Sequence, residues 1–123
     1  MKLQGLAKLA RSTDVFRKVL HTGRRLQIVI MSVRKGEGTS EESHPHSDQL
    51  LYVLHGDGEA MVGGRIHDLD RGDGLFVATG TRLKIRNTGD DELRVLVVVS
   101  PPVFPEGLVQ EFREIAVSPE WEE

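Results

Sequence analysis

The chain has 123 residues, 16 basic and 19 acidic side chains, a formal charge of −3 and 38% hydrophobic residues. This composition is typical of one globular domain, and the mixed charges leave no basic stripe for nucleic acid. No apolar run reaches the ~18 residues of a membrane-spanning helix, and the absence of cysteine excludes disulfides, thiolate metal ligands and a thiol nucleophile. We therefore expect a cytoplasmic protein whose partners include neither nucleic acid nor a membrane.

Residues 1–14 predict a short N-terminal arm. Their basic side chains all precede the first acid, Asp14, as in a targeting peptide, but the long apolar segment of such a peptide is missing. We expect the arm instead to cover the body of the domain through Leu3, Leu6 and Leu9.

The next part of the chain is a series of short apolar runs separated by glycine turns. The runs are rich in β-branched residues, which favour strands. They lie at 26–33, 75–77, 83–86 and 93–99, and the segment 50–69 holds two or three more, separated by glycine turns. Pro101 and Pro102 end the last run because proline has no N–H to donate to a sheet. Short strands at this spacing predict an all-β sandwich or barrel over residues 15–102.

Alternation within these runs predicts which side chains face the interior. Leu51 and Val53 should line the barrel, whereas Tyr52 and Leu54 should face outward, where a partner subunit could cover them. Residues 103–123 are expected to form a C-terminal tail with at most a short helix.

Two glycine-bounded blocks stand out inside the predicted barrel. In the first, Gly38 is followed after five residues by His44, and His46 comes two positions later. Gly56 closes this block, and six residues separate it from Gln49.

The second block has the same kind of regular spacing. It contains Gly72, Gly80 and Asn87, with Ala78 two positions before Gly80 and Leu83 three positions after it.

Together the blocks resemble the two motifs of the cupins, G-x5-H-x-H-x3–4-E-x6-G and G-x5-P-x-G-x2-H-x3-N. This sequence has Gln49 at the glutamate, Ala78 at the proline and Leu83 at the second-motif histidine. The resemblance implies a double-stranded β-helix, or jelly-roll, barrel and a homodimer. It also implies a divalent metal at the barrel mouth, held in the family by the two histidines, the glutamate and the second-motif histidine.

The residues present give that metal site an incomplete set of ligands. On a strand, His44 and His46 would point to one face, and imidazole suits Fe, Mn, Ni, Cu or Zn. Gln49 offers only an amide oxygen, and Leu83 offers no ligand. Glu42 shares parity with the histidines and is a further candidate, although it could also be a solvated loop acid. The histidine pair could equally be structural, so the predicted cofactor is one divalent ion or none.

Two functions from different classes fit these residues, and we favour the first. One is a small-molecule-binding module with an eroded metal site and a pocket lined by Leu51, Val53 and Leu83. The other is a metal-dependent enzyme of the dioxygenase or isomerase type, with an ion on His44, His46 and Gln49. No catalytic residue can be assigned from the sequence, and a homodimer is compatible with both functions.

Overall fold

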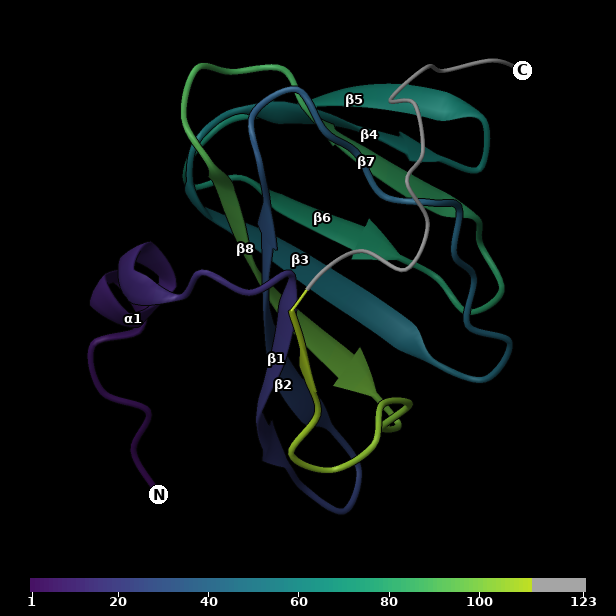
Figure 1. The fold of residues 1–123 in the computed structure, drawn as a ribbon. Coiled ribbons are helices and arrows are strands. Elements are labelled where there is room, and N and C mark those ends of the chain that lie inside the picture. Colours follow the sequence, from purple (N-terminus) through teal and green to yellow (C-terminus); the bar gives the residue numbers. More distant parts are fainter. Residues whose placement is uncertain (112–123) are drawn as a thin grey trace.

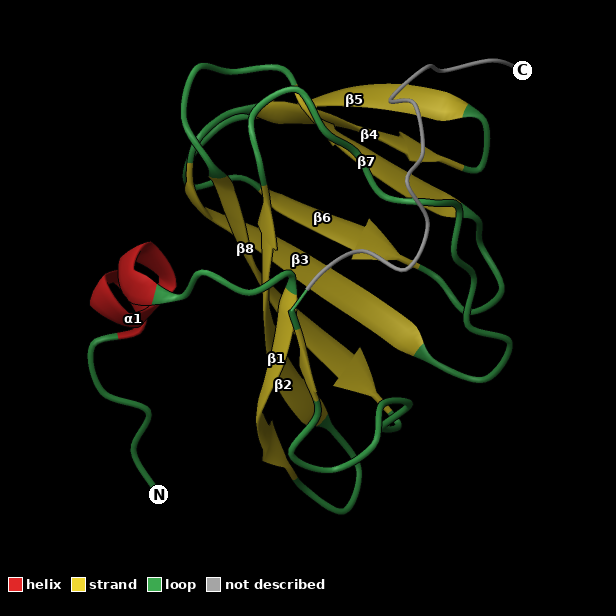
Figure 2. Cartoon of the chain, in the orientation of Figure 1, coloured by secondary structure: helices red, strands yellow, loops and turns green. Residues whose placement is uncertain are grey.

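The computed structural model describes residues 1–111, which form two β-sheets and one helix. The larger sheet has the strand order β6-β3-β8-β2-β1-β9 and the smaller sheet has the order β5-β4-β7. Figures 1 and 2 show the smaller sheet facing the larger one, with the helix outside both. The elements are α1 (Leu6–Ser12), β1 (Arg17–Thr22), β2 (Gln27–Val33), β3 (Asp48–His55), β4 (Gly58–Val62), β5 (Arg65–Leu69), β6 (Gly74–Val77), β7 (Leu83–Asn87), β8 (Leu93–Ser100) and β9 (Val109–Gln110). The predicted all-β architecture is confirmed.

Alternate residues of the central strands form the interior of the molecule. Leu51 pairs with Val97, which pairs with Val29, so these three side chains lie in one row across β3, β8 and β2. All are 5% exposed or less, because residues two apart on a strand share a face. Val53 is also buried and Tyr52 is 42% exposed, which confirms the predicted phase of β3.

The segment before β3 runs along β7 and completes one wall of the interior. Gly38 forms a bridge with Arg86, and Glu42 forms a bridge with Leu83. Glu42 donates its N–H to the carbonyl of Leu83 at 2.9 Å and accepts the N–H of Leu83 at 2.8 Å. This pairing fixes the residues that lead into the first histidine block against the second block.

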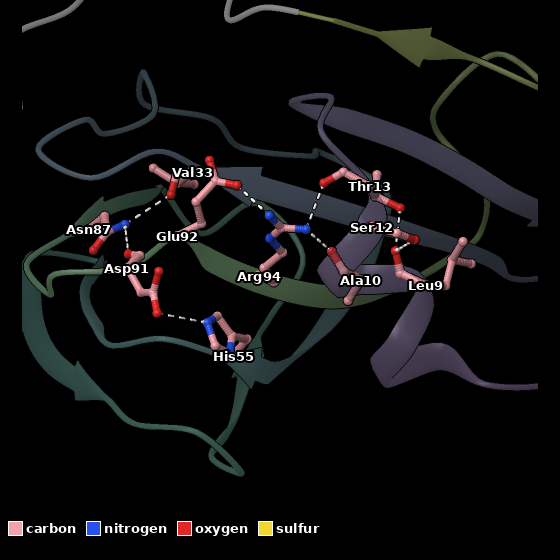
Figure 3. Close-up of polar contacts among 10 residues, drawn as sticks. All are labelled: Leu9, Ala10, Ser12, Thr13, Val33, His55, Asn87, Asp91, Glu92 and Arg94. Atoms are coloured by element: carbon pink, nitrogen blue, oxygen red, sulfur yellow. Dashed lines mark hydrogen bonds and ion pairs between the residues drawn. The ribbon is translucent and has the colours of Figure 1, made fainter.

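Gly56, which closes the first block, fills a position that only glycine can occupy. Its φ is +85°, in the left-handed region, and a Cβ there would collide with the carbonyl of Glu92. Asn87, which closes the second block, organises the neighbouring turn. Its Nδ2 donates to the carbonyls of Val33 and Asp91 (Figure 3). Its Oδ1 accepts the N–H of Gly89.

A buried arginine fastens helix α1 to the larger sheet. The guanidinium of Arg94, on β8, donates to the carbonyls of Ala10 and Thr13 at the end of the helix and pairs with Glu92 (Figure 3). The carbonyl of Ala10 also accepts the N–H of Thr13 at 3.3 Å, so the guanidinium adds a side-chain donor at this helix end and holds the arm on the domain.

The chain after β8 folds back beside β1 and β2. Gln27, which is fully buried, accepts the N–H groups of Val103 and Phe104 and donates to the carbonyl of Phe104. Strand β9 then pairs with β1. The predicted C-terminal tail, 103–123, contains β9 and no helix in residues 103–111, and 112–123 lie outside the described residues. Within residues 1–111, no helix is long and apolar enough to cross a membrane.

Candidate functional site

A cavity opens between the two sheets and is walled mainly by apolar side chains. It measures about 370 Å³ with its mouth included, but the space open to the centre of a water molecule is only about 20 Å³. The apolar wall comes from four strands and consists of Val29, Met31, Leu51, Leu83, Ile85 and Val97. Leu51 and Leu83, which the sequence analysis assigns to a pocket, line this cavity, whereas Val53 is buried in the core and is not among the lining residues.

The polar side of the cavity is built around an ion pair. Nη2 of Arg17 lies 2.7 Å from Oε2 of Glu42, and both residues line the cavity. The guanidinium stacks on Phe104 at 4.6 Å and Phe16 at 4.9 Å, and its Nη1 donates to Gln110 at 3.0 Å. These contacts hold the side chain in one place, because a cation over two ring faces is attracted to both. Arg17 itself is only 8% exposed.

Glu42 therefore lies inside the mouth of the cavity and not on a solvated loop. The bridge to Leu83 sets its direction, and its side chain is 30% exposed. Its second oxygen, Oε1, is 3.7 Å from Nε2 of His44.

His44 is the histidine that the structure brings to the site. Its side chain is 16% exposed and meets the ring of Phe104 edge-on, with centroids 5.7 Å apart. Nε2 is buried and has no hydrogen-bond partner among the described residues. Burial lowers the pKa of His44 because it disfavours the charged imidazolium; the carboxylate of Glu42 opposes that shift, and the Arg17 charge adds to it.

His46 has a different environment from His44. Both residues precede β3, and Pro45 and His46 form a turn in which His46 is exposed. The expectation that both imidazoles share one face of a strand is therefore wrong, because the proline turn interrupts the alternation on which it rested.

Gln49, at the glutamate position of the first motif, does point inward. It lies on β3 opposite Val99 and Val77, is 6% exposed and lines the cavity. Its amide forms no hydrogen bond within the part of the chain that the structure describes. Two further residues of the site, Arg17 and Phe104, were not found from the sequence, since both lie outside the two motif blocks.

The donor set does not fit a tightly bound metal. Among residues 1–111, no three histidine, aspartate or glutamate side chains are grouped so that they could hold an ion. Leu83 stands where the family motif has a histidine, and the carboxylate that could replace it, Glu42, is already paired with a guanidinium. A metal ion next to Glu42 would also face the positive charge of Arg17.

A second hollow lies at the other end of β3 and is open and polar. It is lined by His55, Gly56, Asp57, Arg71, Asp90 and Asp91, and Nε2 of His55 lies 3.4 Å from Asp91 (Figure 3). His55 is thus separated from Gln49 by the length of β3, as its sequence position predicts.

Comparison with known proteins decides the family. The model described as "Cupin domain" matches residues 29–99, which include both motif blocks and the strands that carry Leu51, Leu83 and Val97. The chain belongs to the cupin family. This confirms the resemblance seen in the sequence and the predicted double-stranded β-helix fold.

This cupin is similar to several bacterial proteins. YrkC of Bacillus subtilis (strain 168) is 30% identical over 119 residues, covering 92% of this chain and 64% of YrkC. The tetracenomycin polyketide synthase protein TcmJ of Streptomyces glaucescens is 39% identical over 66 residues, covering 54% of this chain and 44% of TcmJ. The cupin thus spans less than two thirds of these relatives.

Among solved structures, the protein BH2720 from Bacillus halodurans superimposes with a TM-score of 0.85 at 31% identity. That match covers 89% of this cupin and 88% of the other chain. The two-sheet arrangement around the cavity is therefore found at nearly full length in another bacterial protein.

Proposed function

We propose that this cupin binds a small organic molecule in the cavity between its sheets and holds no metal tightly. The observation that carries the proposal is the composition of the wall: six aliphatic side chains and Phe104 line the cavity together with one ion pair, one amide and the hydroxyl of Thr39. Ligand sites of this kind combine a mostly apolar surface with a few placed polar groups. Leu83 extends the apolar surface to the position where the motif has a metal-binding histidine.

The size of the cavity limits the ligand. About 20 Å³ open to water centres is room for about one water molecule. A ligand larger than a few heavy atoms must therefore displace Phe104, which closes one side of the mouth, or remain partly in the mouth.

The relatives support an organic ligand only by analogy. TcmJ is named as a polyketide synthase protein, and polyketides are carbon skeletons with ketone and hydroxyl groups. We propose that the ligand of this cupin is likewise a largely apolar carbon compound with few polar groups.

A second candidate function, an enzyme, is favoured by one observation. The His44 imidazole lies 3.7 Å from the Glu42 carboxylate beside the cavity, and a histidine whose pKa burial lowers stays uncharged and able to accept a proton. In this function His44 is the proton acceptor for a bound ligand. The dioxygenase or isomerase alternative, with an ion on His44 and His46, remains the competing hypothesis for a metal-loaded protein.

Elemental analysis of tag-free protein, as isolated and after reconstitution with Fe, Mn, Ni, Cu and Zn, tests the proposal. We expect no stoichiometric ion in the natural sequence. Leu83→His is the matched comparator: it restores the motif histidine next to Glu42, and we expect it to raise metal affinity by about tenfold or more. One tightly held ion per chain, lost in a His44→Ala/His46→Ala variant, would contradict the proposal and favour the metalloenzyme.

We further propose a homodimer in the cytoplasm. The outer face of the larger sheet supports the dimer, since Leu50, Tyr52 and Phe76 are 47%, 42% and 62% exposed there. The cysteine-free sequence is compatible with a reducing compartment.

A further inference from the structure

The charged groups that line the cavity cancel each other. Among the described residues, Arg17 and Glu42 are the two charged side chains of the lining, and they form a 2.7 Å ion pair with each other. A ligand in the cavity therefore meets a neutral pair and not a net field of either sign.

Neither partner is free to turn toward a ligand of the opposite charge. Phe16, Phe104 and Gln110 hold the guanidinium, and the backbone bridge to Leu83 holds Glu42. An anion would approach the fixed carboxylate, and a cation would approach the fixed guanidinium. Like charges brought together in a partly desolvated site are strongly unfavourable.

Gln49 and Thr39 are the uncharged polar residues of the lining, and the hydroxyl oxygen of Thr39 already accepts the N–H of Ile85 at 3.0 Å. The Gln49 amide is therefore the group we consider for a ligand. Gln49 is 6% exposed, and its amide makes no hydrogen bond within residues 1–111. A primary amide offers both a donor and an acceptor. A ligand group complementary to this amide must therefore also donate one hydrogen bond and accept another.

We infer that the cavity selects uncharged ligands whose polar end both donates and accepts hydrogen bonds, as a carboxamide does. In this assignment Gln49 binds the polar end, and the Arg17–Glu42 pair excludes charged analogues. The inference rests on the proposed function, because it specifies the ligand class of the same cavity.

The test uses probes that have the same shape and differ in charge. Each set contains a carboxamide, a carboxylate and an amidine on one carbon body, which near neutral pH are neutral, negative and positive. Acetyl, isobutyryl and benzoyl bodies cover the range of sizes that the cavity could admit. Binding is measured by NMR titration, followed at the methyl groups of Leu51, Leu83 and Val97.

We expect the carboxamide to bind at least about tenfold more tightly than either charged analogue of the same body. A carboxylate or amidine that binds as tightly as its carboxamide would overturn the inference and leave the proposed function intact. Failure of all the probes to perturb these methyl groups would instead overturn the proposed function, and the inference with it.

Two isosteric variants change the charge of the lining in opposite directions. Glu42→Gln leaves Arg17 unpaired and should shift the preference toward the carboxylate, whereas Gln49→Glu adds a negative charge and should shift it toward the amidine, each by about tenfold. Glu41→Gln is the matched control, because Glu41 is exposed and does not line the cavity. If Glu42→Gln does not fold, the test rests on Gln49→Glu. An unchanged preference between carboxamide and amidine in that variant would contradict the role of Gln49.

Discussion

His44 shows how the neighbours of one side chain determine its chemistry. The proline that follows it turns the chain, so that His46 is exposed while His44 packs against Phe104 and lies near Glu42. Its buried Nε2 has no hydrogen-bond partner in residues 1–111, and too few other metal-binding groups lie near it to share an ion.

The pKa of His44 has a consequence for stability in mild acid. Because burial lowers the pKa of the folded state, the unfolded chain binds a proton first as the pH falls through the ordinary histidine value, about 6.5. The free energy of unfolding should therefore decrease between that value and the lower folded pKa, by up to about 1.4 kcal/mol per pH unit, and then level off.

Urea denaturation at about pH 7.5 and about pH 5.5 measures this effect. We expect the decrease to be smaller in His44→Gln than in the natural sequence. His67→Gln is the control, because His67 is exposed on β5 and its replacement should leave the decrease unchanged. An equal decrease in the natural sequence and in His44→Gln would show that His44 is not protected from protonation.

At the scale of the elements, the segment between β8 and β9 and its anchor place Phe104 at the site. Gln27 is fully buried, and its side chain makes three hydrogen bonds to the backbone of Val103 and Phe104. This places the ring of Phe104 over Arg17 and against His44. The cavity mouth is thus closed by a segment that a side chain of β2 holds in place.

Replacing that anchor should loosen the segment. Gln27→Met keeps the length of the side chain but leaves the three backbone groups without partners, and we expect a loss of about 2–4 kcal/mol in the free energy of unfolding. Hydrogen exchange at the amide of Phe104 should become faster than at the amides of β3.

The control for this variant is Ser100→Ala. Its hydroxyl donates to the carbonyl of Arg25 in an exposed position, so its removal should cost no more than about 0.5 kcal/mol. Slow exchange at Phe104 in Gln27→Met would mean that β9 and its pairing with β1 hold the segment without Gln27.

The sequence predicted the strands whose apolar residues lie close together along the chain. β2 and β8 are dense in apolar residues, β3 has a run of them, and in β7 they alternate with charged ones. Gln49 and Leu83, which the motif spacing singled out, line the cavity. β1 was not predicted, because its residues Arg17, Lys18 and His21 are polar and it is a strand through its pairing with β2 and β9. Arg17 and Phe104 were missed for the same reason: residues 87 positions apart meet only in the folded chain.

At the scale of the whole molecule, the outer face of the larger sheet carries apolar side chains that are exposed in the single chain. Leu50 on β3 pairs with Phe76 on β6 and with Val98 on β8, and Tyr52 pairs with Leu96. Paired residues on neighbouring strands point to the same side, so these side chains form one apolar surface, with helix α1 covering another part of the sheet. A second copy of the chain would cover this surface and, with it, the edge strand β6.

Phe76→Lys tests the proposed dimer by placing a charge on this surface. We expect size-exclusion chromatography with light scattering to give a dimer mass for the natural sequence and a monomer mass for the variant, because an unpaired charge is costly in an apolar interface. The fold itself should remain intact, since Phe76 is 62% exposed in the single chain.

Ile66→Lys is the matched control, because Ile66 is 52% exposed on β5 of the smaller sheet and its replacement should leave the dimer mass unchanged. A natural sequence that runs as a monomer, or a dimer that only Ile66→Lys dissociates, would contradict an interface on the larger sheet.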